Sequence, residues 1–162
     1  MAPGPKTQRK VPLAWSLFTR GNLCRRGSGG KIVLNDKPLA SISEADLQYL
    51  LGNKVREGKD IEYKRSFPGN AESDKKEFLA DVSSFANTNG GHLIYGIEET
   101  GGVPTAIPGL TLPDLDAAIQ RLDNLIRDGL QPRLTGVQIE PVPLASGAHA
   151  PVFRQSAHVT VR

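Results

Sequence analysis

The sequence predicts an α+β domain in which about three helices pack on a mixed β-sheet. Residues 61–67 alternate between apolar and charged side chains, which is typical of a strand with one buried face. Residues 73–86 and 113–129 each repeat apolar side chains at helical spacing. Two more strand candidates, residues 137–144 and 152–161, follow the last helix. This mixture indicates a layered domain with helices on one or both faces of the sheet.

Length and composition are those of a single folded domain. The chain has 162 residues, of which 38% are hydrophobic, enough for one core but not for two. Its longest nearly apolar run, residues 11–18, is too short to cross a bilayer, so we expect no membrane span. The single Cys24 can form neither an internal disulfide nor a cysteine zinc site, which favours a reducing, cytoplasmic location.

Positive charge is concentrated at the N-terminus. Residues 1–30 carry six basic side chains and no acidic one, so the net charge of +3 leaves −3 for residues 31–162. The N-terminal arm is rich in Gly, Pro and Arg without periodicity, and we expect it to be disordered. It has three interpretations: a flexible arm that binds phosphate, an organelle transit peptide, or an extension without function. Residues 31–162 form the single folded domain in each case.

The first elements of this domain have clear start and stop signals. Residues 32–34 predict a short strand. Ser43 and Asp46 have the spacing of a capping box, so a helix should begin there and end at Gly52. The alternating strand over residues 61–67 follows, with its apolar side chains on one face. That apolar face consists of Ile61, Tyr63 and Phe67.

The second half of the domain continues with two helices and several strands. Ser73 is expected to cap a helix whose apolar face packs on the sheet. This face consists of Phe78, Val82 and Phe85. Residues 92–97 are an apolar run that predicts a central strand, and residues 104–109 a loop or an edge. The third helix should have Pro113 in its first turn and Gly129 at its end, before the last two strands.

Three pieces of the sequence, in this order, resemble a known domain. They are Glu57-Gly-Lys-Asp-Ile-Glu62-Tyr-Lys64, Phe85-Ala-Asn-Thr-Asn-Gly-Gly91 and His92-Leu-Ile-Tyr-Gly-Ile-Glu-Glu99. Together they resemble the Schlafen-type Alba-like nucleic-acid-binding domain, which combines a Glu-x-x-x-x-Glu-[Phe/Tyr]-Lys strand, a helix ending in Phe-Ala-Asn-Thr-x-Gly-Gly and an apolar strand ending in acids. The resemblance covers residues 43–145 and implies a small DNA-binding domain of regulatory character.

The resemblance also implies a nuclease site. In Schlafen-type ribonucleases, two Glu residues five apart and a later acid form a metal-dependent centre, and Glu57, Glu62 and Glu99 occupy these positions here. They would hold Mg²⁺ or Mn²⁺ and act as the catalytic residues of an endoribonuclease. Residues five apart point to opposite faces of a straight strand, so the chain would have to bend, with Gly58 as the place. The alternatives are a solvated face of mutually paired charges, and Glu98 in place of Glu99.

Nucleic-acid contacts are predicted at two places. The predicted contacts are Lys64, Arg65, Asn87, Gly90 and Gly91. Lys64 resembles the family's Lys and could meet phosphate as a point charge, or form a salt bridge to Glu62 or Glu57. Gly90 and Gly91 turn the chain after the helix, and the resemblance adds a second role in which their amides approach a phosphate. His92 enters a predicted strand, and we expect it to be packed.

Three functions stay open at this level. A small nucleic-acid-binding domain comes first, and a divalent-metal endoribonuclease is the alternative. A protein-interaction module without nucleic acid is the third, because residues 31–162 are net acidic. The expected partner is DNA or RNA, and a homo-oligomer is left open. Residues 151–162 depart from the family pattern, and we interpret them as a truncated or altered end.

Overall fold

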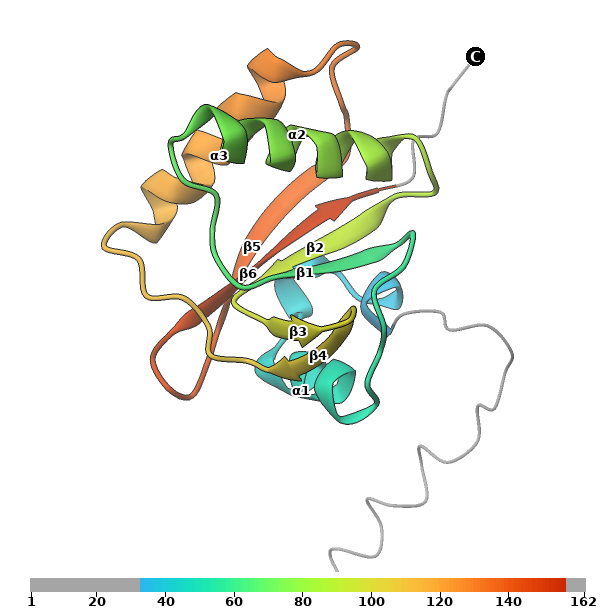
Figure 1. The fold of residues 1–162 in the computed structure, drawn as a ribbon, viewed down its shortest axis with the longest axis vertical. Coiled ribbons are helices and arrows are strands. Elements are labelled where there is room, and N and C mark those ends of the chain that lie inside the picture. The colour runs from blue at the N-terminus through green and yellow to red at the C-terminus, as the bar shows by residue number, and fades with distance from the viewer. Residues whose placement is uncertain (1–32, 157–162) are drawn as a thin grey trace, which may run out of the picture. The chain divides into compact units, whose positions relative to one another are not determined.

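A four-stranded mixed sheet lies at the centre of the protein, and a two-stranded hairpin lies beside it (Figure 1). The computed structural model describes residues 33–156. The helices are α1 (Glu44–Gly52), α2 (Glu72–Ala86) and α3 (Leu115–Gly129), preceded by two short 3-10 helices, Val33–Asp36 and Leu39–Ser41. The strands are β1 (Ile61–Lys64), β2 (Gly91–Tyr95), β3 (Glu98–Thr100), β4 (Val103–Ala106), β5 (Val137–Pro143) and β6 (His149–Gln155). The predicted α+β class is confirmed.

The sheet has the strand order β1-β2-β6-β5. β1 pairs with β2 in parallel, with Ile61 opposite His92, and the other two pairs are antiparallel. β2 is therefore a central strand, as predicted, and all five of its residues are buried. β3 and β4 form the separate hairpin. Residues 104–109, predicted as a loop or an edge, therefore begin within β4.

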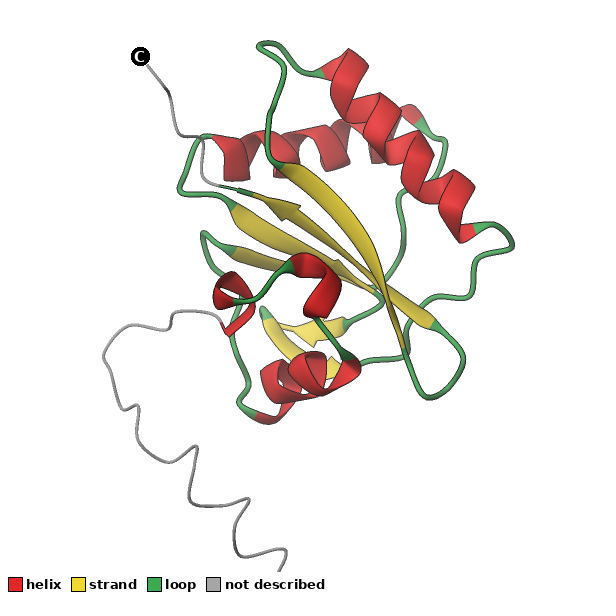
Figure 2. Ribbon diagram, turned by 180° about the vertical axis from the view of Figure 1, so that it is seen from behind, coloured by secondary structure: helices red, strands yellow, loops and turns green. Residues whose placement is uncertain are grey.

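Helices cover both faces of the sheet. α2 and α3 pack on one face, where Phe78, Val82 and Phe85 contact Leu93, Tyr95 and Phe153. Figure 2 shows the opposite face from behind, where α1 and the 3-10 helices lie. The side chains buried there include Leu47, Leu50, Ile61, Tyr63, Ile94 and Val152. Because side chains alternate along a strand, β2 supplies Leu93 and Tyr95 to one core and Ile94 to the other.

The start of α1 follows its predicted signal. The Asp46 carboxylate accepts hydrogen bonds from the backbone N–H of Ser43 at 2.9 Å and from the Ser43 hydroxyl at 3.1 Å. This is a capping box, which satisfies backbone donors that the first turn of a helix leaves free. Lys37 adds an ion pair to the same carboxylate.

The other two helices begin differently from the prediction. α2 starts at Glu72 after Ala71, and Ser73 lies inside its first turn. The Asp74 carboxylate instead accepts a hydrogen bond from the backbone N–H of Gly69 at 2.9 Å, which ties the preceding loop to the helix. In α3 the cap is Asp114, whose side chain accepts from the N–H of Ala117, and Pro113 precedes the helix.

Two strand predictions were wrong in detail. Residues 33–36 form a 3-10 helix, with the Leu34 side chain buried, where a strand was expected. Three apolar residues are too few to show a period, so either conformation was compatible with them. β1 ends at Lys64, and Phe67 packs against Tyr95 on the opposite face from Ile61, with ring centroids 4.9 Å apart. The alternation therefore stops where the strand stops pairing.

Some predictions concern residues that the structure does not describe. The basic arm at residues 1–30 and residues 157–161 of the last predicted strand lie outside the described part. Within residues 33–156, every helix is too short or too polar to cross a membrane.

Candidate nucleic-acid interface

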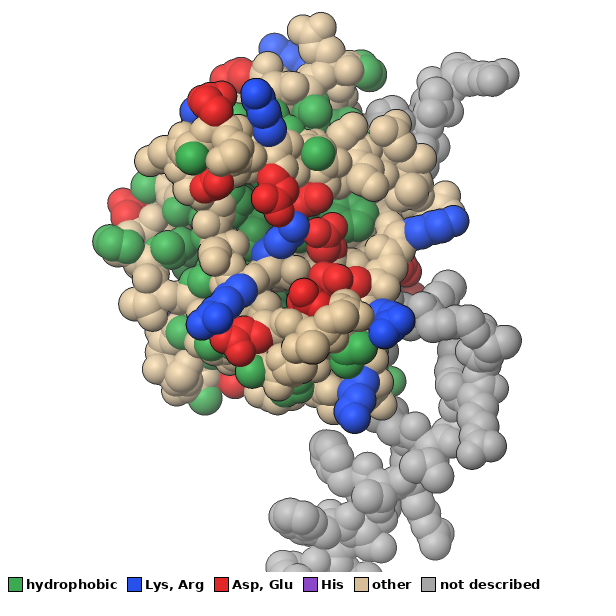
Figure 3. Space-filling model, in the orientation of Figure 1, with side chains coloured by type: hydrophobic (Ala, Val, Ile, Leu, Met, Phe, Trp, Pro, Cys, Tyr) green, Lys and Arg blue, Asp and Glu red, His purple; other side chains and the backbone are tan. Residues whose placement is uncertain are grey.

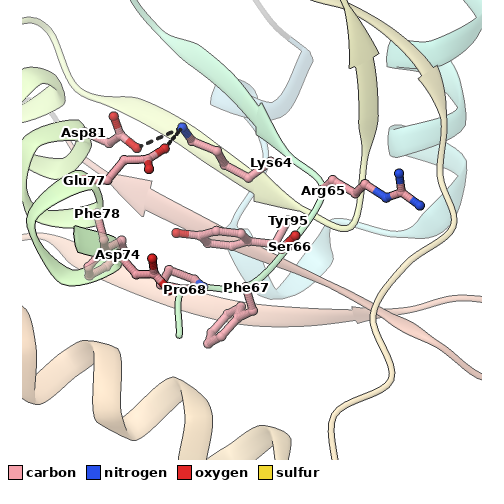
Figure 4. Close-up of a pocket in the computed structure, with 10 residues that line it drawn as sticks. All are labelled: Lys64, Arg65, Ser66, Phe67, Pro68, Asp74, Glu77, Phe78, Asp81 and Tyr95. Atoms are coloured by element: carbon pink, nitrogen blue, oxygen red, sulfur yellow. Dashed lines mark hydrogen bonds and ion pairs between the residues drawn. The ribbon is translucent and has the colours of Figure 1, made fainter. Parts of the chain in front are cut away.

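Lys64 lies at the end of β1 among three carboxylates. Its Nζ is 2.8 Å from Glu62 Oε1, 2.8 Å from Glu77 Oε1 and 3.4 Å from Asp81 Oδ2. Figure 4 shows how Glu77 and Asp81 reach it from α2. Burial acts to lower the pKa of Lys64, but the hydrogen bonds to Glu62 and Glu77 outweigh it and raise the pKa above its usual range. The ammonium stays charged, and its charge is already compensated.

The surroundings of Lys64 are acidic as a whole. A cleft of about 350 Å³ lies between the end of β1 and α2, with Asp74, Glu77 and Asp81 on its α2 side. Burial and then the charge of Glu62 raise the pKa of Asp81. In Figure 3, acidic side chains gather between α2 and the β3–β4 hairpin. Arg65 is 75% exposed but pairs with Glu98 at 3.2 Å, so neither predicted cation faces an uncompensated surface.

The three carboxylates of the predicted metal site are held by different partners. Glu57 accepts a hydrogen bond from the backbone N–H of Tyr63 at 2.8 Å, because the chain bends near Gly58, as the hypothesis required. Glu99 accepts from the N–H of Gly102, whose carbonyl in turn accepts from the N–H of Glu57 at 2.7 Å. Glu62 is paired with Lys64 instead.

The three carboxylates of the predicted metal site do not form one cluster in this structure. Within residues 33–156, no three His, Cys, Asp or Glu side chains lie close enough together to bind one ion. Glu57 and Glu99 come together at Gly102, whereas Glu62 extends from β1 toward the carboxylates of α2. Glu62 and Lys64 form an ion pair, as in the alternative interpretation of a face of mutually paired charges.

The Asn-Thr-Asn-Gly-Gly segment ends α2 by a compact turn. The Phe85 carbonyl accepts hydrogen bonds from the N–H groups of Thr88 and Gly90, both at 3.2 Å. Gly90 has a φ of 85°, a conformation that suits glycine, and a Cβ on Gly91 would lie 2.2 Å from the Phe85 ring. The predicted structural role is confirmed. The amide of Gly90 is already used inside the turn, so it is not available to a phosphate, and Asn87 is the exposed helix cap.

The same turn lines a second cleft, of about 670 Å³, at the end of the sheet. We call it the sheet-end cleft. Its charged and polar walls include Lys59, Asp60, Asn89, His92, Arg154 and Gln155. These residues come from the segment before β1, the α2–β2 turn, the start of β2 and the end of β6. Asp60 is the one acid among the described residues that line it.

The two cations of the sheet-end cleft differ from Lys64 in their partners. Lys59 is exposed, and among the residues in the structure neither it nor Arg154 forms an ion pair with a carboxylate. Arg154 donates to three uncharged acceptors, which are His92 Nε2 at 2.8 Å, the Lys37 carbonyl at 2.8 Å and the Leu34 carbonyl at 2.5 Å. A guanidinium has five N–H groups, so two remain for a ligand.

His92 is a neutral hydrogen-bonding group in the wall of this cleft. Its side chain is 1% exposed, and burial and then the charge of Arg154 lower its pKa to about 4. The expectation that His92 is packed is confirmed. Sequence reasoning missed Lys59 and Arg154 as candidates. Lys59 stands inside the quoted motif, but nothing in the sequence marks Arg154 as its neighbour.

Comparison with known proteins gives the family. Residues 57–160 match the family described as Schlafen, AlbA_2. The chain belongs to this family. The Schlafen AlbA_2 match reaches residue 160, beyond the end expected at residue 145, so β6 lies within the matched range. No curated protein matches the chain.

One solved structure supports the Schlafen AlbA_2 assignment and the fold class. It is the solution NMR structure of the N-terminal domain of an ATP-dependent DNA helicase RecG-related protein from Nitrosomonas europaea. The two are 27% identical in sequence, and the similarity covers 75% of this chain and 78% of that chain, with a TM-score of 0.54.

Proposed function

We propose that this chain is a nucleic-acid-binding domain that contacts its partner at the sheet-end cleft. Membership of the Schlafen AlbA_2 family supports a nucleic-acid-related function. DNA is the partner we propose, because the similar domain belongs to a protein related to a DNA helicase. A regulatory role through binding is the specific form of this proposal.

The observation that carries the proposal is the pair of cations in the sheet-end cleft that have no carboxylate partner among residues 33–156. Phosphate contacts come mostly from Lys, Arg and polar side chains, and they supply most of the affinity of nucleic-acid binding. Lys59, Arg154 and Asn89 are such groups, and they face a cleft with a single acid. Lys64 lies among three carboxylates, which would repel a phosphate.

The N-terminal segment supplies further positive charge to the chain. Residues 1–30 carry six basic side chains and are joined to the described domain through Val33. Leu34 is the residue after Val33. Arg154, in the wall of the cleft, donates a hydrogen bond to its backbone carbonyl. Leu34, near the start of the described domain, therefore lies beside the proposed interface. The charge of residues 1–30 offsets the net negative charge of residues 31–162.

Binding of labelled DNA by the full chain, followed by fluorescence anisotropy, tests the proposal. We expect measurable affinity at about 50 mM salt that weakens about tenfold by 200 mM, as the release of counterions from about two phosphates requires. Absence of binding at the lower salt, or affinity that does not depend on salt, would refute it. Parallel titrations with RNA of the same sequence decide the choice of DNA.

A further inference from the structure

The cleft between the end of β1 and α2 is surrounded by more carboxylates than cations. We call this space of about 350 Å³ the acidic cleft. Its charged groups and their direct partners are the acids Glu62, Asp74, Glu77, Asp81 and Glu98 and the cations Lys64 and Arg65. Three of the acids share the Lys64 ammonium, and Arg65 is paired with Glu98. The cleft therefore keeps an excess of negative charge.

The loop that forms one wall of the acidic cleft is held from two sides. This loop, residues 66–70, follows β1. Arg121 of α3 donates to the Gly69 carbonyl at 2.7 Å and also to the Pro68 carbonyl. On the other side, the Asp74 carboxylate accepts the Gly69 N–H at 2.9 Å. The wall is thus preformed, and little ordering is needed when a ligand enters.

A hydroxyl group without a partner faces the acidic cleft. The Tyr95 side chain is 1% exposed, and its hydroxyl forms no hydrogen bond within residues 33–156. Burial and then the charge of Asp81 raise the pKa of Tyr95, so the hydroxyl stays protonated. In the described residues, the side-chain atoms that are enclosed without a partner belong to His92 and Gln155. The Tyr95 hydroxyl is therefore open to the cleft, and Figure 4 shows it directed toward α2.

These features indicate a cationic ligand that carries several N–H groups. The side chains of Glu77 and Asp81 are 66% and 18% exposed, so both carboxylates can be reached. A metal ion is not indicated, since no three His, Cys, Asp or Glu side chains of residues 33–156 lie close enough together to bind one. A guanidinium carries five N–H groups and also packs on aromatic rings. Phe67, whose ring centroid is 4.9 Å from that of Tyr95, supplies such a ring in the wall.

We propose that the acidic cleft binds an arginine side chain from a basic segment of a partner protein. The guanidinium donates to the carboxylates of Glu77 and Asp81 and to the Tyr95 hydroxyl, and the aliphatic stem packs on Phe67. A volume of about 350 Å³ is at the lower end of the range of ligand sites, which suits one long side chain.

This inference goes beyond the proposed function, because it concerns the opposite end of the sheet. His92, at the start of β2, lines the sheet-end cleft, whereas Tyr95, at the end of the same strand, lines the acidic cleft. A nucleic acid and a protein partner therefore meet different surfaces. The two surfaces also differ in charge, which selects a phosphate at one and a guanidinium at the other.

Three labelled peptides test the inference. They are an octapeptide in which Arg alternates with Ser, the same peptide with Lys, and the same peptide with citrulline, which keeps the shape of Arg without its charge. In anisotropy titrations of the full chain, we expect the Arg peptide to bind about tenfold more tightly than the citrulline peptide. It should bind about threefold more tightly than the Lys peptide, because only a guanidinium is planar with five donors. The net charge of the chain is +3, so attraction of a basic peptide reports a local acidic site.

Two variants locate the binding site. Glu77→Gln should weaken binding of the Arg peptide about fivefold. Glu140→Gln, which removes an exposed acid from β5, is the matched control and should leave this affinity unchanged. Tyr95→Phe removes only the hydroxyl and should weaken binding about threefold. Its melting temperature should stay the same, because the hydroxyl has no partner in the described part of the chain.

Several outcomes would overturn the inference. They are the absence of peptide binding at low salt, equal affinity for the Arg and Lys peptides, and unchanged affinity in either Glu77→Gln or Tyr95→Phe. Lys59→Gln, in the sheet-end cleft, should leave the affinity for the Arg peptide unchanged. Failure of DNA binding would refute the proposed function and leave this inference standing, so the two are tested separately.

Discussion

Lys64 Nζ and Glu77 Oε1 lie 2.8 Å apart and join the edge strand β1 to α2. Glu62 and Asp81 complete the surroundings of the same ammonium. This arrangement explains why a Lys in a nucleic-acid-binding motif need not contact nucleic acid. The ammonium holds three carboxylates together that would otherwise repel one another across the strand–helix contact. Its role in this structure is to stabilise the packing of α2 beside β1.

We therefore expect Lys64→Gln to lower the stability of the protein and to change its affinity for nucleic acid little. Removing the ammonium leaves three carboxylates close together, and we expect a loss of about 1 kcal/mol in the free energy of unfolding, measured by urea denaturation at pH 7. Lys76→Gln, which removes an exposed cation from α2, is the matched control and should change stability little. A loss of nucleic-acid affinity in Lys64→Gln as large as that of Lys59→Gln would instead show a phosphate contact at Lys64.

Lys59→Gln is expected to weaken nucleic-acid binding without a change in stability. Each lost phosphate contact reduces the slope of log affinity against log salt by about 0.9, which corresponds to about threefold in affinity between 50 and 200 mM salt. Anisotropy titrations at four salt concentrations measure this slope. The control is again Lys76→Gln, and an equal change of slope in the control would remove the case for the sheet-end cleft.

Deleting residues 1–30 is expected to weaken binding while leaving the fold intact. The deletion removes six basic side chains, so affinity should fall by a similar factor for all sequences and the salt slope should become shallower. The cores described above are formed within residues 33–156, so cooperative unfolding should persist. Circular dichroism and thermal melting check the fold, and a lost melting transition would contradict this prediction.

Asp46→Asn is expected to lower stability at neutral pH, and the difference should disappear in acid. Burial acts to raise the pKa of Asp46, but hydrogen bonds from Lys37 and Ser43 outweigh it and hold the pKa below the ordinary 3.8. A carboxylate with a depressed pKa contributes stability in full above its unfolded value, and this contribution is lost as the pH falls through its folded pKa.

The size of that effect follows from the capping box. Loss of an N-terminal cap lowers the free energy of unfolding by about 1 kcal/mol, and we expect this difference between the two proteins at pH 7. Urea denaturation in steps from pH 7 down to pH 3 measures it. A difference that stays constant over this range would show that the charge of Asp46 is not what stabilises the start of α1.

Local patterns in the sequence were sufficient for most of the elements. The capping box at Ser43, the buried face of α2 and the buried strand β2 could all be predicted, because each depends on residues within a few positions of one another. The family resemblance depended on contiguous motifs as well, and it is confirmed. The wrong strand at residues 32–34 shows the limit of this reasoning, since a run of three apolar residues has no period.

The candidate site depended on contacts that no local pattern encodes. Arg154 meets His92 only because β6 inserts beside β2, and these two residues are far apart in the sequence. The placement of α2 brings Glu77 and Asp81 to Lys64 at the end of β1, and no pattern within β1 encodes these contacts. Periodicity shows which face of an element is buried, but strand order and helix placement come from packing of the whole core. The sequence therefore determined the family and the elements, and the tertiary structure decided which charges are compensated and which line an open cleft.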